Sequence, residues 1–545
     1  MLDRIQDRLK RYDVWIIVIP LIVLTAIGTV IMLRPDQSFL FIDWMKMAIV
    51  DKLGGYYLLF GAASVTALLW LIFGKYRNVR LGDRDTPAMN NFTWGALIYT
   101  STMAADILFY AFHEWIYYYQ SSSLIADGSQ KAAVELAYSY PLFHWGITPW
   151  SFYILPAVAY AYFMFVKKRN VNKMSDAITI TRNPFVLKAI DVISTVSILI
   201  SVSVTLTIST PLIPACIADL LGIEMTPMLS IAILLVIAAM FIAAVMFKMK
   251  GIEKLAEFNV YGYFLLFAIF IFSFNGLFIF EAGLSAIGYN IQNFVRMSLS
   301  VDPARLSGGF TQDWTTFYWA YWIAWAVATP IFIGKISEGR TIKQMILGGM
   351  GAGLLGTMSS FIIFGNFGLA NQVAGRIDAL AMLEAGKSIE SVIIASFNTL
   401  PYLSVVVLFI VALVMMIENA STLDAIILVT SEASYKRRAD QDNPSKRMKI
   451  YWSILFIVLP IVFILNESKL YSLQTLLIVM GLPMSFILLG VAISFFRALR
   501  RHGEREDMKA RELDERTHGR DALTHERLTP VPTDDGQGQA VLVSE

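Results

Sequence analysis

Residues 313–334 read DWTTFYWAYWIAWAVATPIFIG, a run in which Asp313 is the only charged side chain. A helix needs roughly 20 apolar residues to cross a bilayer, so this stretch predicts one membrane-spanning helix. The whole chain is similarly rich in apolar residues, because its 545 residues are 56% hydrophobic and only 16% charged. A soluble protein of this length would form several cores with charged surfaces between them. We therefore expect an all-α integral membrane protein.

Working outward from this stretch, apolar runs of similar length predict twelve spans. They lie at about 14–33, 55–74, 94–119, 147–166, 187–212, 228–247, 258–280, 313–334, 345–368, 402–430, 450–466 and 473–497. Lysine and arginine cluster in alternate connections, whereas the stretch 120–146 has only Lys131. Positive loops face the cytoplasm, so both termini are expected there. The start, 1–13, is expected to be a cytoplasmic leader and not a signal peptide.

Several classes of protein are disfavoured by composition and by missing motifs. The one cysteine, Cys216, excludes an internal disulfide and a multi-cysteine metal site. A net charge of +2 gives no field that would attract nucleic acid. The sequence lacks a Walker lysine motif, a nucleotide-binding glycine loop and HExxH, and no segment resembles a channel filter. We therefore expect no enzyme, cofactor or metal. If the chain moves a solute across the membrane, the energy should come from an ion gradient or from exchange.

Polar residues inside the predicted spans are the first candidates for function, because such residues are costly in a membrane. The third span contains Asp106, His113 and Glu114. The seventh contains Asn259, and the tenth contains Glu418, Asn419 and Asp424. Each could be a paired structural residue inside the bundle. For Asp106 and Glu418 we favour a functional role, since a buried acid can offset a cationic substrate or carry a proton.

Aromatic residues of the eighth span are the second set of candidates. At 100° per residue, one face about 100° wide carries Trp314, Tyr318, Tyr321, Trp322 and Trp325, and Trp319 lies off it. An interfacial aromatic belt would occupy one level, whereas this stripe extends about 16 Å, which suits a lined pathway. Aromatic faces attract quaternary ammonium groups, which have no N–H to donate. A second set, Trp145 and Trp150, lies in PLFHWGITPW (141–150), where Gly146 and Pro149 predict a break in the helix.

Two of these stretches resemble a known family. LAYSYPLFHWGITPWSFY (136–153) and GGFTQDWTTFYWAYWIAWAVATPIFIGKISEGRTIKQ (308–344) resemble the betaine/carnitine/choline transporter family, and the resemblance runs from about residue 10 to 500. It implies an inverted-repeat (5+5) fold with broken helices 3 and 8, a homotrimer, and the inner (plasma) membrane. The expected divisions are 1–13, two peripheral helices in 14–74, a five-helix repeat in 94–280, an amphipathic surface segment at 281–312, a second repeat in 313–497, and a charged, partly disordered cytoplasmic tail at 498–545.

The resemblance also implies a substrate site for a small onium compound. The family's central aromatic box falls on Tyr117, Trp145, Tyr321 and Trp322, with Trp325 at its border. The chain resembles the carnitine-exchanger branch of the family most. That branch has a more peripheral or pathway site, which falls on Trp150, Trp314 and Tyr318, with Trp325 again nearby. Tyr321 replaces the usual tryptophan and still offers a π face.

The candidates for ion coupling depart from the family's patterns. Asp106 falls on the last glycine of the third-span break, where choline carriers of the family resemble this chain in having aspartate. Met415 and Met416 occupy the positions of sodium-binding hydroxyls, and a thioether is a poor ligand for a hard cation. Asn259 stands where sodium-independent exchangers have arginine. We expect sodium-independent, possibly proton-coupled uptake of a choline-like cation, with Asp106 and then Glu418 as proton sites. A carnitine/betaine-type zwitterion exchanger, or an amine or amino-acid transporter of another inverted-repeat family, is the alternative.

Overall fold

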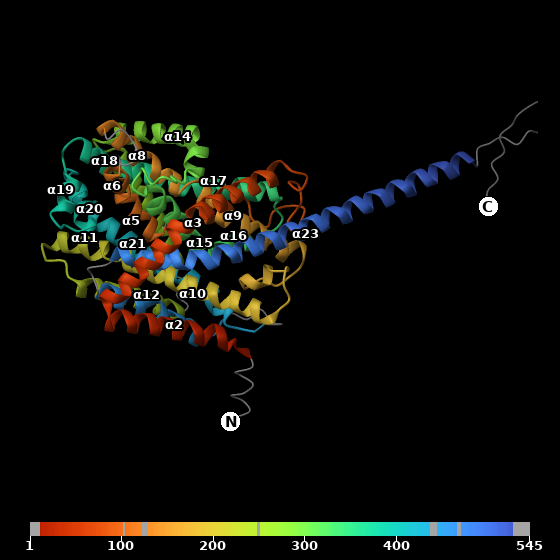
Figure 1. Cartoon of the computed structure of the whole chain (residues 1–545), viewed down its shortest axis with the longest axis horizontal. Helices are drawn as coiled ribbons and strands as arrows, with labels where there is room; N and C mark the ends of the chain where they lie inside the picture. The colour runs from red at the N-terminus through yellow and green to blue at the C-terminus, as the bar shows by residue number, and fades with distance from the viewer. Residues whose placement is uncertain are drawn as a thin grey trace, which may run out of the picture. The chain divides into compact units, whose positions relative to one another are not determined.

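The computed structural model describes residues 11–101, 104–121, 129–247, 251–436, 444–465 and 470–526. The chain divides into two compact units, Met1–Ala492 and Ile493–Glu545. Over the described ranges the first unit consists of helices, with two isolated bridges and no strand. In this unit α5, α9 and α15 lie among the other helices, while α14 lies at an edge (Figure 1).

Most of the predicted spans coincide with long apolar helices. These include α2 (Val14–Leu33), α3 (Pro35–Phe73), α9 (Ile147–Ala161) continuing into the π-turn η1 (Tyr162–Val166), α10 (Pro184–Ser209), α17 (Ile342–Ser360) continuing into the π-turn η4 (Phe361–Gly365), α21 (Ser404–Ala433), α22 (Lys446–Ile464) and α23 (Leu470–Glu526). Eight helices of the described chain are long and apolar enough to cross a membrane. The prediction of an α-helical membrane protein is thereby supported, and α3 is much longer than the 20 residues expected for the second span.

Three further spans are bent pairs of helices. α4 (Asn91–Thr100) meets α5 (Ala105–His113) and α6 (Trp115–Gln120) at 66°, and α13 (Gly251–Ile271) meets α14 (Gly276–Leu299) at 102°. The π-turn η3 (Thr311–Thr316) and α15 (Phe317–Trp325) meet α16 (Ala328–Lys335) at 57°. Counting each pair as one span gives up to eleven. The sixth predicted span is α12 (Pro227–Phe247), whose apolar part, Pro227–Ala243, is shorter than a span. Twelve spans and the inverted repeat therefore stay predictions.

Two of the bends lie where the resemblance predicts broken helices 3 and 8. The eighth span bends at Ala326 and Val327, between α15 and α16. Pro330 has no N–H to donate to the carbonyl of Ala326, four residues earlier. The chain turns there on a short bond in which the Val327 N–H donates to the Trp325 carbonyl at 2.7 Å. The bend therefore has a local cause in the sequence.

The junction between α8 (Gln130–His144) and α9 lies at the predicted break around Gly146. A Cβ atom at Gly146 would lie 2.3 Å from the Leu142 carbonyl oxygen, so only glycine fits. α9 is buried along nearly its whole length and packs against α3, α16 and α17. The stretch 120–146, which we treated only as a connection, thus contains a helix that holds Trp145 in the protein interior.

α14 begins five residues before the predicted surface segment 281–312 and covers its first part, to Leu299. One face of this helix is apolar and exposed, with Leu277, Phe280, Leu284, Ile287, Ile291 and Val295 at helical spacing. The other helices of the first unit are α11 (Leu212–Leu221), α18 (Asn366–Val373), α19 (Ala379–Glu384), α20 (Ile389–Asn398) and the short 3₁₀ turn η2 (Met174–Ala177). In the tail, helix continues to Glu526, and the end predicted to be disordered, 528–545, lies outside the described residues.

Candidate functional site

Asp106 lies in the first turn of α5, directly after the bend in the third span, and is only 7% exposed. The Tyr321 hydroxyl of α15 donates a hydrogen bond to its carboxylate at 2.6 Å. Thr205 of α10 donates to the same oxygen at 3.4 Å, and the Ile107 N–H donates to the other at 2.9 Å. The positive end of the helix dipole also favours negative charge there. Three separate helices therefore converge on one buried carboxylate.

Trp145 is the centre of a buried aromatic cluster next to Asp106. Its ring centroid lies 5.3 Å from Trp322, 5.8 Å from Tyr318 and 6.1 Å from Tyr321. Tyr110 of α5 completes the group at 5.5 Å from Trp145 and 6.1 Å from Tyr321. Because Tyr321 touches both Trp145 and Asp106, an onium group beside Tyr321 would be near a carboxylate and several π faces at once.

The remaining predicted aromatic residues are grouped differently from the prediction. Tyr117, assigned to the central box, stacks on Trp314, assigned to the peripheral set, with ring centroids 4.6 Å apart. Trp150, assigned to the peripheral set, instead lies against Trp322 at 5.7 Å. Tyr318 packs within the Trp145 cluster. The two predicted sets thus form one continuous aromatic region.

Trp325 and Trp319 mark the limits of this region. Trp325 ends α15 at the bend, and its buried indole N–H has no hydrogen-bond partner among the described residues. Trp319, which lies off the predicted stripe, is fully buried and packs against Phe143 at 5.3 Å and Phe152 at 6.1 Å. Trp319 therefore belongs to the packing between α15 and its neighbours.

Glu114 is a buried residue to which the sequence reasoning gave no particular role. Its carboxylate accepts a hydrogen bond from the Trp145 indole N–H at 2.5 Å and from the Tyr118 hydroxyl at 2.5 Å. Tyr118 also bonds to His144 Nδ1 at 2.6 Å, and His144 Nε2 bonds to the Thr315 hydroxyl at 3.0 Å. The spacing of four residues between Glu114 and Tyr118 was the one available sequence signal for this network.

The backbone at the α8–α9 junction is held by two other helices. The Trp322 indole N–H donates to the His144 carbonyl at 3.1 Å. The Thr357 hydroxyl of α17 donates to the Trp145 carbonyl at 2.8 Å. These bonds fix the position of the Trp145 ring relative to α15 and α17.

Two other coupling candidates, Asn259 and Glu418, are bonded to each other. Asn259 of α13 donates its amide to the Glu418 carboxylate of α21, and Ser421 donates to the same carboxylate at 3.4 Å. Met415 is fully buried one turn earlier on α21. The side chain of Asp424 lies outside the described residues. Glu418 and Asn259 therefore form a pair, separate from the pair of Asp106 and Tyr321.

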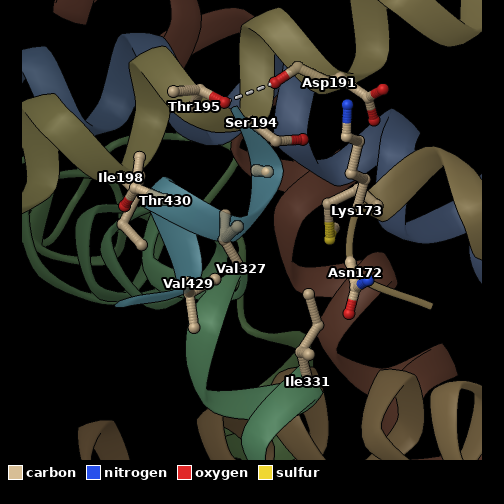
Figure 2. A pocket seen from close by; sticks show the side chains of 12 residues that line it. Asn172, Lys173, Asp191, Ser194, Thr195, Ile198, Val327, Ile331, Val429 and Thr430 are labelled. Atoms are coloured by element: carbon tan, nitrogen blue, oxygen red, sulfur yellow. Dashed lines mark hydrogen bonds between the residues drawn. The ribbon is translucent and has the colours of Figure 1, made fainter. Parts of the chain in front are cut away.

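A pocket lies between the ends of α10, α16 and α21 and the loop before α10 (Figure 2). Its polar residues include Asn172, Lys173, Asp191, Ser194 and Thr195, and Figure 2 shows the Lys173 side chain extending toward the Asp191 carboxylate. Asp191 precedes Thr205 on α10 by fourteen residues, or about 21 Å along the helix. In the predicted orientation the pocket is on the cytoplasmic side of Asp106.

A short N-terminal segment, residues 11–13, which we call the strap, lies against the same elements. The Asp13 N–H donates to the Ser434 carbonyl at 2.8 Å, and the Lys436 N–H donates to the Arg11 carbonyl at 3.0 Å. The buried Asp13 carboxylate pairs with Lys173, at 3.0 Å, and with Lys188 of α10. The strap thereby connects the end of α21 to the beginning of α10.

Bent apolar helices that place carboxylates and aromatic rings in the middle of the bundle are the arrangement of a secondary transporter. Residues 15–504 match the family model described as "BCCT, betaine/carnitine/choline family transporter". The chain belongs to this family, and the resemblance seen in the sequence is confirmed. It is accordingly a multi-pass transporter of the inner (plasma) membrane for a small-molecule substrate.

Two curated relatives are similar over most of their length. A "carnitine transporter" of Acinetobacter baumannii is 26% identical over 438 residues, which cover 79% of each chain. An "uncharacterized transporter YeaV" of Escherichia coli (strain K12) is 27% identical over 447 residues, covering 79% of this chain and 90% of the relative.

Proposed function

We propose that this transporter takes up a small onium cation of the choline type, independently of sodium and with proton coupling. The observation that carries the proposal is the 2.6 Å hydrogen bond from Tyr321 to Asp106. It joins a buried carboxylate to the aromatic cluster around Trp145, and it brings together residues from the two predicted halves of the chain.

Electrostatics favours a simple cation over a zwitterion at this position. A unit charge about 4 Å from the Asp106 carboxylate is stabilised by about 4 kcal/mol at an effective dielectric constant of 20. The carboxylate of betaine or carnitine would be repelled by the same group. Each aromatic face adds about 0.5–2 kcal/mol for the onium group. A carboxylate together with Trp145, Tyr321 and Trp322 is therefore suited to a group like that of choline.

We assign different roles to the two acidic candidates. In proton symport the cation and the proton are bound at the same time, and one carboxylate cannot neutralise both. Asp106 contacts the aromatic cluster through Tyr321 and so suits the substrate. Glu418 is bonded to Asn259 and Ser421 and suits the proton. This assignment refines the expectation that Asp106 itself carries the proton.

Sodium independence is supported by Met415, which is buried on α21 where related sodium carriers have hydroxyl groups. Hard cations prefer oxygen ligands to a thioether. For the assembly we propose the homotrimer that the family resemblance implies, and the exposed apolar face of α14 offers a surface that neighbouring copies could cover.

Exchange of zwitterions is the second candidate. The Acinetobacter baumannii relative is called a carnitine transporter, which favours a zwitterionic substrate but does not bear on exchange. Asn259 weighs against the arginine-based version of that mechanism. It supplies no positive charge, and its amide is bonded to Glu418.

The test is uptake of labelled choline, carnitine and betaine into proteoliposomes that contain the purified protein. We expect choline to accumulate under an inward proton gradient and not under a sodium gradient. Glu418→Gln should abolish accumulation while choline still exchanges across the membrane without a gradient. Asp106→Asn should reduce both the accumulation and the exchange of choline, because it weakens choline binding. The exposed Glu224→Gln is the control and should change neither. Gradient-independent exchange of a zwitterion, unaffected by Asp106→Asn, would refute the proposal.

A further inference from the structure

Glu114 is a buried carboxylate to which the proposed function assigns no role. It is fully buried, as is His144. It lies one helical turn from Tyr118 on the stretch that carries Tyr117, and it reaches the central ring of the cluster, Trp145. Burying a carboxylate is costly unless its oxygens accept hydrogen bonds, and each Glu114 oxygen has one short bond.

We take Glu114 to be ionised, because its hydrogen-bond partners can all be satisfied in that state. The Trp145 indole N–H can only donate, so it must bond to an acceptor oxygen. If Tyr118 donates its one proton to Glu114, then His144 Nδ1 donates to the Tyr118 oxygen. His144 Nε2 then accepts from the Thr315 hydroxyl. Every group in the network is satisfied with a neutral histidine and a negatively charged Glu114.

A charged acceptor on the indole N–H changes the ring that the substrate would meet. Hydrogen bonds to an ionised partner are about twice as strong as neutral ones and polarise their donors. Withdrawal of the N–H proton toward Glu114 places more electron density on the indole face, and this face attracts cations through its quadrupole. The Trp145 face would therefore attract an onium group more strongly than the face of an unbonded tryptophan.

We infer that Glu114 is a specificity-determining residue that makes the Trp145 face selective for a positively charged headgroup over a neutral one of the same shape. This inference rests on the proposed function, since it concerns the same aromatic cluster. Its chemical content is distinct, because Asp106 acts directly through Tyr321 whereas Glu114 acts through the indole ring.

Glu114→Gln removes the charge and leaves a network that can be satisfied. The glutamine carbonyl can accept from Trp145, and its amide can donate to Tyr118. Tyr118 can then donate to His144 Nδ1, and His144 Nε2–H can donate to Thr315. Tyr118→Phe is the matched control, because it breaks the network and keeps the charge on Trp145.

The experiment measures binding to the purified full-length protein by tryptophan fluorescence, with choline and with 3,3-dimethylbutan-1-ol, its neutral carbon isostere. We expect Glu114→Gln to weaken choline binding about tenfold. The isostere should be affected less than about twofold, and Tyr118→Phe should change choline binding less than about threefold.

Two outcomes would overturn the inference. If Glu114→Gln binds choline as the wild type does, the carboxylate does not contribute to selectivity. If it weakens choline and the isostere equally, Glu114 only positions the ring. A wild-type protein that does not bind choline would instead refute the proposed function. The same comparison would then be made with whichever onium compound the wild type binds, since the charge argument holds for any of them.

Discussion

Loss of the Asp13 carboxylate should detach the strap from the helix ends that it connects. The Asp13 side chain is 3% exposed, while Lys173 and Lys188 are 14% and 35% exposed. A hydrogen bond to a charged group contributes about 1.5–3 kcal/mol. Both lysines are partly hydrated, and asparagine can still accept one bond, so we expect Asp13→Asn to lose about 2 kcal/mol of strap stability. At 1.4 kcal/mol for each factor of ten, local opening becomes about 30-fold more frequent.

Hydrogen–deuterium exchange followed by mass spectrometry measures this opening directly. The Lys436 N–H is protected by its bond to the Arg11 carbonyl, so its exchange should be about 30-fold faster in Asp13→Asn. Glu432→Gln is the control on the same end of α21. It removes a partly exposed pair with Lys335 and should change exchange less than about threefold. Equal exchange in the wild type and Asp13→Asn would refute the reasoning.

The pH dependence of this effect has a definite sign. Burial raises the pKa of Asp13, but hydrogen bonds and positive charge from Lys188 and Lys173 outweigh it and hold the pKa below its usual value. A carboxyl group whose pKa is lowered by folding stabilises the folded state above its unfolded pKa, about 3.9. That contribution is lost as pH falls through the folded pKa. The difference between wild type and Asp13→Asn should therefore be constant from pH 5 to pH 8.

Three further predictions concern packing and assembly. A Cβ at Gly353 would lie 2.6 Å from the Trp150 ring, so Gly353→Ala should add about 1–3 kcal/mol of strain and weaken choline binding in the fluorescence titration. Gly351→Ala, which meets nothing within 4 Å, should bind normally, and equal affinities would contradict us. Arg340 donates to Asn91 at 2.7 Å and lies 3.9 Å above the Trp94 ring. Arg340→Lys should therefore lower the free energy of unfolding by about 1–2 kcal/mol more than the exposed Arg77→Lys does. The melting temperature should fall further for Arg340→Lys, and equal melting temperatures of the two variants would refute this prediction. Light scattering should give the mass of three 61.1 kDa chains for the wild type. Ile291→Glu, which changes the exposed face of α14, should give a smaller assembly. An unchanged mass would mean that lipid, and not a neighbouring copy, covers this face.

Helices and their interruptions were the most predictable features of this chain, because their causes are local. Length and apolarity predicted the long helices, and Gly146 marked the junction before α9, where a Cβ atom would clash with the chain itself. Pro330 accounts for a bend within the eighth span by removing one backbone donor. Such features depend on residues within a few positions of one another, so a single sequence contains the required information.

The grouping of side chains was less predictable, because it depends on contacts between distant segments. A regular helix placed Trp314 on the same face as Tyr318, but the π-turn over Thr311–Thr316 changes the register between them. Trp314 consequently meets Tyr117 and not Trp145. The Glu114 network joins residues up to 171 positions apart, as between His144 and Thr315. No periodicity within one segment could have revealed it.

The bonds at the end of α8 have a consequence for how motion in this transporter is measured. The carbonyls of His144 and Trp145 belong to the stretch 94–280, whereas their donors, Trp322 and Thr357, belong to 313–497. If these two stretches rock against each other, the α8–α9 junction will move with the second one, or both bonds must break. Dyes placed on 136–153 would then report no change in distance to α15, even during a full transport cycle. Dye pairs that measure the distance between α10 and α17 would detect the motion, because neither helix contains the α8–α9 junction.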